Sequence, residues 1–412
     1  MGSVAPSLAG WEWLRDKRLQ SVMRALADAG GTARAVGGCV RDALLDADVA
    51  PEDVDIATNL LPEQVMEAGE KAGLGVHPTG LQHGTIMLTA GDESNRTGYE
   101  VTTLRIDVET DGRHAEVAFT QDWVEDAMRR DFTMNALYCD ADGAVFDPIS
   151  GYADLIAKRV VFVGDAEQRI REDYLRILRF YRFLARFGVE NVDTASREAC
   201  GALRLGLDDL SRERIAHEFS RLLAARFAYE TLKLMRDDGI LGHVLDRDPE
   251  LDAFANLKSV ITENGLQSER VLLMSILFPS ASVNQLRKAF VLTNEETKRL
   301  EKLNAAGPVA PGLRNEEIDR LIYWAGDQTF YDVLLVRWAQ SGASGNDESW
   351  RRLLARWCEW KRPSLPVTGA DLIDLGIEQG PALGKALQTL EDWWIAGGFK
   401  DNKEALLKRL EK

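Results

Sequence analysis

The chain has 412 residues, of which 45% are hydrophobic and 28% are charged. These fractions are ordinary for globular proteins, so they exclude a disordered or fibrous chain, and the length allows for about two to four domains. The formal net charge of −16 argues against non-specific nucleic-acid binding by the surface as a whole.

The first 150 residues alternate between helix and strand signals. Helical periodicity is present at 11–29, 40–45 and 61–72, and short apolar strand patterns are present at 54–56, 84–89 and 99–103. This segment is acidic, with 12 Lys/Arg and 26 Asp/Glu. After residue 150 the periodicity is helical, at 169–187, 211–227, 229–237, 271–278, 295–303, 315–325, 350–360 and 382–394. The only clear strand signal there is at 160–163, so the sequence predicts an α+β fold with a mixed sheet first and helices afterwards.

Two glycines and two aspartates form the strongest local motif. Gly37 and Gly38 stand directly before a predicted helix, where a turn can bring backbone N–H groups to a phosphate, and Arg41 lies in the first turn of that helix. Asp53 and Asp55 are two positions apart, so on a strand both carboxylates share one face and can hold a divalent cation such as Mg²⁺. Either pair alone is usually a turn or a solvated edge, but the two pairs in this order favour a phosphoryl-transfer site.

Three further segments add polar groups. Glu100 lies inside a short β-branched strand, where a carboxylate is either solvent-exposed or a third acid of the site. Residues 107–120 are polar and contain glycine, which predicts a mobile loop beside the site. Arg130, Asp131 and Asn135 lead into a predicted apolar helix, either as an N-cap or as ligands of a ribose and triphosphate.

Together these motifs resemble the class II tRNA nucleotidyltransferases, a family of CCA-adding enzymes and bacterial poly(A) polymerases within the polymerase-β-like nucleotidyltransferases. The matching segments occur in the order GGCVRD with DVD, EVTTLR, DGRHAEVAF, RRDFTMNAL, FDPISGYADL, GDAEQRIREDYLRILRFYRF and SRERIAHEF. They cover residues 33–222 densely, and residues 366–387 are similar to the family's C-terminal tRNA-contacting segment. The implied fold is a polymerase-β-like catalytic head (1–150) followed by an all-α neck (151–226), body (227–340) and tail (341–412).

The resemblance also implies roles for the matching positions. Asp53 and Asp55 would bind Mg²⁺ and Glu100 would be a third catalytic carboxylate. The residues facing the triphosphate would be Gly37, Gly38 and Arg41, and those binding ribose and phosphate would be Arg130, Asp131 and Asn135. The residues recognising the incoming base would be Asp173, Arg176 and Arg179.

The base-recognition role has a physical reading. On one helix, Asp173 and Arg176 are neighbours three residues apart. A carboxylate accepts from an exocyclic amino group and a guanidinium donates to a ring nitrogen, and CTP and ATP both present such a donor beside an acceptor. The pair would therefore accept CTP and ATP and reject UTP and GTP. The alternative reading is an intrahelical salt bridge.

The implied activity is template-independent addition of CCA to the 3′ end of tRNA from CTP and ATP, in which a primer hydroxyl attacks the α-phosphate and pyrophosphate leaves. The apparently full length of 107–120 favours complete CCA addition over a CC-adding or A-adding enzyme. A poly(A) polymerase is disfavoured because the chain is acidic and lacks that branch's basic signature. A small-molecule nucleotidyltransferase is disfavoured by the long helical C-terminal region, and a binding-only protein by the intact motif residues.

The expected partner is the acceptor end of tRNA, bound through a local basic strip. The candidates are residues 169–226, within a segment (151–240) that holds 14 arginines and 2 lysines, and the cations Arg351, Arg352, Arg356, Lys361 and Arg362. The nearby tryptophans are expected to pack in the core rather than to stack on RNA; they are Trp350, Trp357 and Trp360. No obligate protein partner, signal peptide or membrane segment is visible, and the four scattered cysteines fit a reducing cytoplasm.

Overall fold

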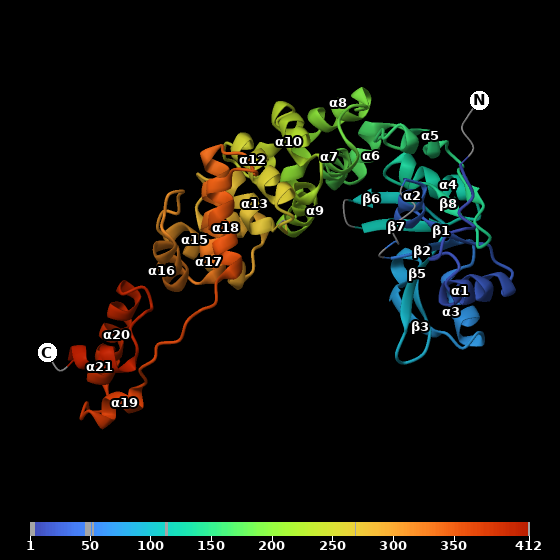
Figure 1. The fold of residues 1–412 in the computed structure, drawn as a ribbon. Helices are drawn as coiled ribbons and strands as arrows, with labels where there is room; N and C mark the ends of the chain where they lie inside the picture. The colour runs from blue at the N-terminus through green and yellow to red at the C-terminus, as the bar shows by residue number, and fades with distance from the viewer. Residues whose placement is uncertain (1–4, 46–50, 52, 112–113, 268, 411–412) are drawn as a thin grey trace. The chain divides into compact units, whose positions relative to one another are not determined.

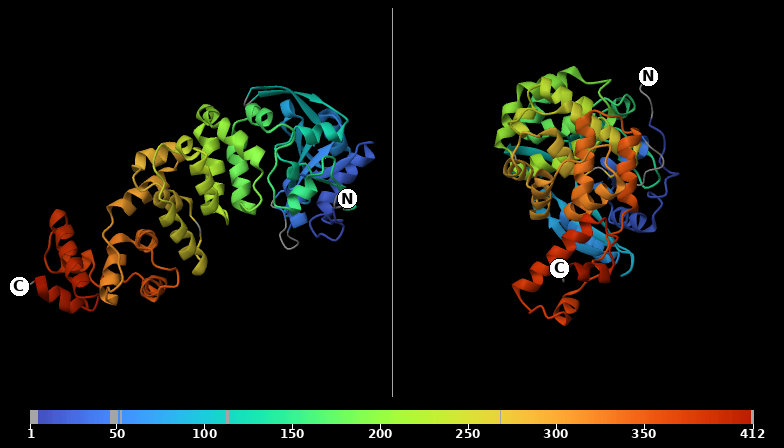
Figure 2. Two further views of the ribbon diagram at one scale, coloured as in Figure 1. Left: turned by 90° about the horizontal axis from the view of Figure 1, so that it is seen from above. Right: turned by 60° about the vertical axis from the view of Figure 1, so that its left-hand side comes forward.

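The computed structural model describes residues 5–45, 51, 53–111, 114–267 and 269–410. The chain divides into two compact units, Met1–Asp246 and Arg247–Lys412. Within the described residues, every strand lies in the first unit and the second unit is helical (Figures 1 and 2). The predicted α+β class, with a mixed sheet followed by helices, is confirmed. The division into head, neck, body and tail stays a prediction.

A seven-stranded mixed sheet organises the first unit. Its strand order is β3-β4-β5-β2-β1-β8-β9, with β2 and β5 parallel and the other pairs antiparallel. The strands are β1 (Ala33–Val36), β2 (Asp55–Thr58), β3 (Gly75–Gly80), β4 (Thr85–Ala90), β5 (Thr97–Thr103), β8 (Tyr138–Cys139) and β9 (Val145–Phe146). Ile56 lies opposite Val101 in the parallel pair. The preceding residues, Asp55 and Glu100, therefore occupy equivalent positions on neighbouring central strands.

The helices against this sheet follow the apolar periodicity. They are α1 (Lys17–Asp28), α2 (Gly38–Leu45), α3 (Pro62–Lys71) and α4 (Trp123–Met128). Helix α1 buries Leu19, Val22 and Leu26, and it packs against α3 and β4. It begins later than the predicted residue 11 because the Asp16 side chain accepts from the Arg18 N–H and caps the helix there.

The segment 107–120 is not the predicted loop. β6 (Arg105–Asp111) and β7 (His114–Phe119) pair antiparallel as a separate two-stranded sheet, so the loop prediction is wrong for the described residues. An Asp-Gly pair between two alternating segments is the usual sequence signal of a hairpin. That signal is present at 111–112 and outweighs the polar composition.

Two other predicted elements are shorter than expected. The apolar helix after Asp131 is a 3₁₀ turn, η2 (Thr133–Asn135), followed directly by β8. The strand at 160–163 is reduced to an isolated bridge between Phe132 and Phe162. The helical turn ends because the chain enters β8, which pairs with β1.

The rest of the first unit is helical. It contains α5 (Gly151–Ile156), α6 (Ala166–Glu172), α7 (Leu175–Phe187), α8 (Thr194–Ala202), η1 and η3 (the 3₁₀ turns Leu81–His83 and Arg204–Asp209), α9 (Arg212–Ala224), α10 (Ala228–Asp237) and α11 (Leu241–Val244). The single helix predicted at 169–187 is wrong, because Asp173 has extended backbone (φ −157°, ψ 105°) between α6 and α7. The Asp173 carboxylate accepts from the N–H of Leu175, the first residue of α7, in a local side-chain turn before that helix.

Aromatic contacts fix α7 to the residues around η2. The ring centroids of Phe132 lie 4.8 Å from Phe162 and 5.4 Å from Phe183, and Phe162 lies 5.9 Å from Phe180. All four rings are buried. Each such pair contributes about 0.5–1.5 kcal/mol beyond area burial. Because Phe132 follows Asp131 directly, this packing also sets the distance between Asp131 and α7.

The second unit consists of α12 (Leu251–Glu263), α13 (Arg270–Leu277), α14 (Val283–Phe290), α15 (Asn294–Ala305), α16 (Asn315–Ala325), α17 (Asp327–Ser341), α18 (Glu348–Glu359), α19 (Gly369–Asp374), α20 (Pro381–Ala396) and α21 (Lys403–Leu410). Trp350 is buried and stacks on Trp338 at 6.0 Å, and Trp357 stacks on Tyr331 at 4.6 Å. Trp360 packs against Phe399 at 5.9 Å. The expectation that these tryptophans pack in the core is confirmed for Trp350, whereas Trp357 and Trp360 are only partly buried.

No helix in the described part of the chain is long and apolar enough to cross a membrane. The four cysteines are all free; Cys39, Cys139 and Cys200 are buried and Cys358 is exposed.

Candidate active site

The turn between β1 and α2 requires glycine at one of its two positions. Gly37 has φ +76°, in the left-handed region that favours glycine, and its N–H donates to the Leu137 carbonyl oxygen at 3.1 Å. A Cβ on Gly37 would lie 3.8 Å from Arg130 Nη1, so the Arg130 guanidinium lies beside the turn. Gly38 has no positive φ, and a Cβ there would make an ordinary 3.8 Å contact with Arg41. The backbone of the protein therefore requires glycine at position 37 and does not require it at position 38.

Three acidic residues gather near this turn. Asp53 precedes β2, Asp55 begins it, and Glu100 occupies the equivalent position on β5. Partial burial raises the pKa of Asp55, the negative charges of Glu100 and Asp53 raise it further, and the Arg130 charge opposes this. A carboxylate whose pKa is raised by neighbouring negative charges marks a site of excess negative charge.

This donor set fits a divalent cation. Hard cations such as Mg²⁺ bind carboxylate oxygens, and the repulsion felt by Asp55 is the charge that such a cation neutralises. Among the described residues, no three His, Cys, Asp or Glu side chains stand close enough together to form a metal-binding group. The residues therefore fit a divalent cation by the type of their donor atoms and not by a preformed cluster. Asp53 and Asp55 are the residues that would hold the ion.

A buried aspartate that the sequence did not single out holds Arg130. Asp126 accepts from Arg130 Nη2 at 2.9 Å, from Arg129 Nε at 2.8 Å and from the Tyr138 hydroxyl at 2.7 Å. Burial raises the pKa of Asp126, but the charges of Arg130 and Arg129 and the Tyr138 hydrogen bond outweigh it and lower the value to about 2. The sequence signal for this group is the i, i+4 spacing between Asp126 and Arg130.

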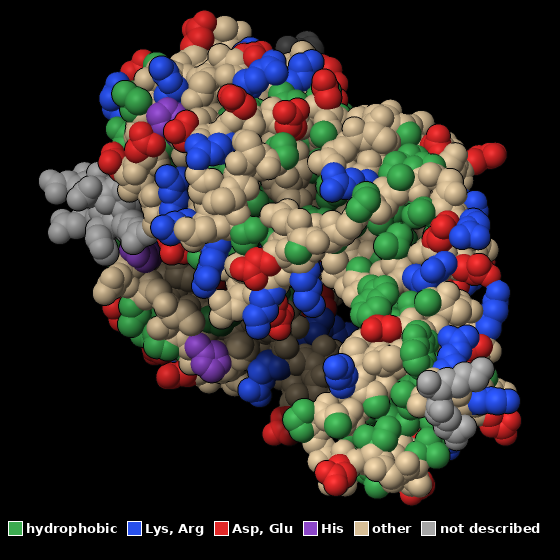
Figure 3. Space-filling model, turned by 90° about the vertical axis from the view of Figure 1, so that its left-hand side faces the viewer, with side chains coloured by type: hydrophobic (Ala, Val, Ile, Leu, Met, Phe, Trp, Pro, Cys, Tyr) green, Lys and Arg blue, Asp and Glu red, His purple; other side chains and the backbone are tan. Residues whose placement is uncertain are grey.

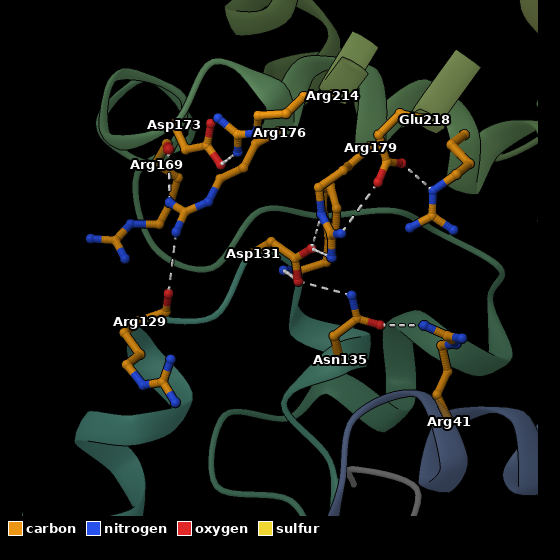
Figure 4. Close-up of polar contacts among 12 residues, drawn as sticks. Arg41, Arg129, Asp131, Asn135, Arg169, Asp173, Arg176, Arg179, Arg214 and Glu218 are labelled. Carbon is orange, nitrogen blue, oxygen red and sulfur yellow. Dashed lines mark hydrogen bonds and ion pairs between the residues drawn. The ribbon is translucent and has the colours of Figure 1, made fainter. Parts of the chain in front are cut away.

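A chain of hydrogen bonds connects α2 to α7 through η2. Arg41 Nη1 donates to Asn135 Oδ1 at 2.6 Å, and Asn135 Nδ2 donates to Asp131 Oδ1 at 2.8 Å. Arg179 Nε then donates to Asp131 Oδ2 at 2.8 Å (Figure 4). Arg41 is buried and also donates to both oxygens of Asp42. Four predicted site residues thus form one network.

Burial alone would make Asp131 a weak acid. It raises the pKa of this carboxyl, but the Arg179 charge and the hydrogen bonds from Asn135, Arg179 and the Phe132 N–H outweigh it and lower the pKa to about 2. Asp131 is therefore ionised across the physiological range and keeps Arg179 in place.

Asp173 and Arg176 do not pair with each other. Asp173 Oδ2 accepts from Arg214 Nη2 at 2.7 Å and Oδ1 accepts from the Leu175 N–H at 3.1 Å. Arg176 Nη1 donates instead to the Arg169 carbonyl oxygen at 2.7 Å (Figure 4). It also donates to Glu172. The alternative of an Asp173–Arg176 salt bridge on one helix is wrong, because the helix breaks at Asp173.

The first unit therefore contains every predicted site residue, in three groups. The groups are the acidic edge with Arg130 and the Gly37 turn, the Arg41–Asn135–Asp131–Arg179 network, and the α6–α7 junction with Asp173 and Arg176. Four supporting residues were not among the predicted site residues, namely Asp126, Glu172, Arg214 and Glu218, although the last three lie in segments that resemble the family. Arg214 and Glu218 lie about 40 positions from their partners, so only the fold brings them together.

The basic strip predicted on α18 is largely engaged within its own unit. Arg356 pairs with Asp319, Arg352 donates to Asn315 and Arg351 donates to Asn264. Arg362 lies 4.1 Å from the Tyr323 ring and donates to the Tyr323 carbonyl oxygen. Across the face in Figure 3, positive and negative side chains are interspersed.

Three family models match consecutive parts of the chain. Residues 33–161 match the Poly A polymerase head domain, and residues 191–254 match the "Probable RNA and SrmB-binding site of polymerase A". Residues 267–410 match tRNA nucleotidyltransferase domain 2. The matches thus extend over both compact units.

Individual relatives match over nearly their whole length. The chain is 35% identical to the mitochondrial CCA tRNA nucleotidyltransferase 1 of Mus musculus, covering 96% of this chain and 90% of that one. It is 31% identical to a CCA-adding enzyme of Latilactobacillus sakei, covering 94% and 96%. Among solved structures, the Bacillus stearothermophilus CCA-adding enzyme in complex with CTP has a TM-score of 0.75 at 27% identity, covering 96% and 97%. The Thermotoga maritima CCA-adding enzyme complexed with tRNA shares the fold, with a TM-score of 0.68 at 17% identity, covering 99% of each.

Proposed function

The chain belongs to the CCA-adding tRNA nucleotidyltransferase family, and on that premise we propose that it adds C, C and A to the 3′ end of tRNA, using CTP and ATP and no nucleic-acid template. The observation that carries this proposal is the end-to-end similarity, since it includes the helical second unit as well as the catalytic head. The match to the Poly A polymerase head domain, at residues 33–161, does not by itself separate CCA addition from poly(A) addition.

The reaction is a phosphoryl transfer. The 3′-hydroxyl oxygen of the primer forms a bond to the α-phosphorus of CTP or ATP, the bond to the bridging oxygen breaks, and pyrophosphate leaves with the electron pair. Arg130 lies beside the Gly37 turn and would bind the triphosphate together with Gly37, Gly38 and Arg41. Asp131 and Asn135 would bind ribose and orient these cations. Asp126 keeps Arg130 in place.

Asp53 and Asp55 would hold Mg²⁺, and Glu100 would add a third negative charge beside them. When bound, the ion supplies positive charge at the phosphate oxygens and at the attacking hydroxyl. The raised pKa of Asp55 supports this assignment, because a carboxylate beside other negative charges favours a bound cation.

Asp173 and Arg176 would select the base, although not as helix neighbours. The Asp173 carboxylate would accept from the exocyclic amino group of cytosine or adenine, and Arg176 would donate to the adjacent ring nitrogen. UTP and GTP would leave these groups unpaired, which costs a factor of about 10⁴ where a site is built for a specific hydrogen bond. Arg179, held by Asp131, would complete the recognition surface.

The compartment that we propose is the cytoplasm, because all four cysteines are free thiols. The mouse relative's name places that protein in mitochondria. Fractionation of the native cell or organelle distinguishes the two.

The test is an incorporation assay with Mg²⁺ and single labelled nucleotides. The primers are a tRNA lacking its 3′ CCA, a tRNA ending in CC, and an oligo(A). Two C additions followed by one A, and then a stop, are expected on the first primer, and one A on the second.

Other products would overturn the proposal in defined ways. C addition alone would make the protein a CC-adding enzyme, and A addition limited to the CC-ended tRNA would make it an A-adding enzyme. Long A tails on any primer would make it a poly(A) polymerase. No incorporation would favour a small-molecule acceptor or a binding-only role.

A further inference from the structure

Helix α16, in the second unit, ends with a tryptophan that differs from the others in the chain. All ten tryptophans lie in the described part of the chain, and only Trp324 is exposed, at 58%. The other nine are buried or half-buried. A single exposed apolar ring is common on protein surfaces, so the groups around Trp324 decide what it can bind.

The residue before Trp324 supports the indole from the core. Tyr323 is buried, and its ring packs against Trp394 at 6.1 Å and Phe399 at 5.3 Å. Its hydroxyl donates to Glu391. The rings of Tyr323 and Trp324 are perpendicular, with centroids 6.4 Å apart. One perpendicular contact cannot cover both faces of an indole, so Trp324 presents a flat apolar face to solvent.

Two arginines lie beside this ring. Arg320 is four positions before Trp324 and therefore shares its face of α16. The guanidinium of Arg362 lies 4.1 Å from the centre of the Tyr323 ring, and its Nη1 donates to the Tyr323 carbonyl oxygen at 3.0 Å. Among the residues that the structure describes, neither arginine forms an ion pair with a carboxylate.

The carboxylates of α16 are paired with other cations. These ion pairs are Glu316–Lys400, Glu317–Arg314 and Asp319–Arg356. The charges of Arg320 and Arg362 are therefore left over beside the exposed indole. This local excess of positive charge stands out in a chain whose net charge is −16.

An exposed aromatic face beside unpaired guanidinium groups is the combination that binds unpaired nucleotides. A base stacks on the ring and the adjacent phosphates contact the cations. In RNA, the bases of loops and ends can leave their own stack in this way, whereas the bases of a duplex cannot. An apolar protein surface would leave both guanidinium charges without partners, so the charge favours RNA.

We propose that Trp324 stacks on an unpaired base of the tRNA and that Arg320 and Arg362 contact the phosphates beside that base. The proposal rests on the proposed function, because that function identifies the bound RNA as tRNA. It assigns a tRNA contact of the second unit to α16 and not to α18, where Arg356 is paired with Asp319. None of the predicted catalytic residues takes part, so the contact serves binding and not the chemical step.

The experiment uses the full chain and a tRNA lacking its 3′ CCA. It measures the tRNA Kd at several salt concentrations, together with kcat and the KM values for tRNA and CTP. The variants are Trp324→Ala, Trp324→Phe and Arg320→Gln. The matched control is Ile156→Ala, which shortens an apolar side chain that is 51% exposed in the first unit. The melting temperature of each protein is also measured.

Trp324→Ala is expected to raise the tRNA Kd and the KM for tRNA at least about fivefold, because it removes the stacking of one base. The kcat, the KM for CTP, the melting temperature and the salt dependence of Kd should not change. Trp324→Phe keeps a flat ring and should lie between Trp324→Ala and the wild type. Arg320→Gln should lower the slope of log Kd against log salt by about 0.7, because it removes one phosphate contact. The control should match the wild type.

Ultraviolet cross-linking tests the stacking directly. In the wild type, the tryptic peptide 321–337 should carry a cross-linked nucleotide at Trp324, and this cross-link should be absent from Trp324→Ala.

If Trp324→Ala bound tRNA as tightly as the wild type and the wild type gave no cross-link, the inference would be overturned and a protein partner would be the next occupant to consider. A wild type that bound tRNA through Trp324 but added no nucleotide would instead refute the proposed function.

Discussion

Charges are unbalanced at the acidic edge and balanced in the ion pairs around α7 and α9, which we call the α7–α9 network (Asp131–Arg179, Asp173–Arg214 and Glu218–Arg182). On the edge, burial and the like charges of Glu100 and Asp53 raise the pKa of Asp55, and Arg130 is the one cation that opposes them. In the network, Asp131 is paired with Arg179, Asp173 with Arg214 and Glu218 with Arg182, all within the protein. An acidic site with unbalanced charge is suited to a cation and phosphates, whereas a balanced one is suited to holding side chains in fixed directions.

This contrast in charge balance suggests that the acidic edge and the network have different roles. Chemistry would depend on the edge, where substitution changes rate with little effect on the fold. Selection and rigidity would depend on the network, where substitution leaves a buried partner unpaired. Substitutions at the acidic edge should therefore change mainly the reaction rate, and substitutions in the network should change the stability of the fold.

The largest effect is expected at the edge. Asp55→Asn should lower the rate of nucleotide addition at least about 1,000-fold, or about 4 kcal/mol in the barrier, because it removes a predicted metal ligand. Thermal stability should be unchanged or slightly higher, since a repulsion is relieved. Single-turnover addition and a melting curve check both, with the exposed Glu70→Gln as the control. Near-normal rates would end the metal-ligand assignment.

The largest effect on stability is expected at Asp131. Asp131→Asn should lower the free energy of unfolding by about 3 kcal/mol, because breaking a buried ion pair leaves Arg179 without its closest partner. Denaturant unfolding followed by far-UV circular dichroism measures this. A loss below about 0.5 kcal/mol, as is typical of surface changes, would contradict the balanced-network description.

The pH dependence of stability sharpens the same point. The folded pKa of Asp131 is about 2 and therefore lies below the unfolded value of about 3.9. Ionised Asp131 therefore contributes about 2 kcal/mol to the free energy of unfolding. This contribution is fully present above the unfolded pKa and is lost as the pH falls through the folded pKa. The wild type should thus lose more unfolding free energy than Asp131→Asn between about pH 5 and pH 2. If the unfolding free energies of the wild type and Asp131→Asn changed in parallel with pH, the lowered pKa of Asp131 would be refuted.

The smallest effect concerns the turn beside the edge. Gly37→Ala should cost about 1–2 kcal/mol of stability because position 37 has φ +76°. Gly38→Ala is the matched control, with no positive φ and open contacts, and should change stability by less than about 0.5 kcal/mol. Equal effects in the two variants would remove the special role of Gly37.

Much of the fold could be predicted because it depends on local periodicity. The helix at 315–325 and the mixed first unit follow directly from apolar spacing. The break at Asp173 could not be predicted this way, since the apolar pattern continues through it and only the extended backbone of Asp173 in the structure reveals it. The hairpin at 105–119 was missed because its polar composition outweighed its Asp-Gly signal.

The site divides along similar lines. Asp53, Asp55 and Gly37 are visible in the sequence because short spacing and turn chemistry identify them. Arg214 and Glu218 lie in the family-like segment SRERIAHEF, but spacing does not reveal their partners, because the packing of α9 on α7 brings the partners to them. Asp126 is an intermediate case. The sequence shows its i, i+4 spacing from Arg130, but it does not show that Asp126 is buried.

Equilibrium binding of CTP and UTP to Asp55→Asn and Asp173→Ala tests this division of labour most directly. The account predicts that Asp55→Asn keeps the preference for CTP while losing nucleotide addition, and that Asp173→Ala loses at least about tenfold of that preference while still adding nucleotides. If Asp55→Asn lost the preference, or if Asp173→Ala kept it in full, the separation of chemistry from selection would be contradicted.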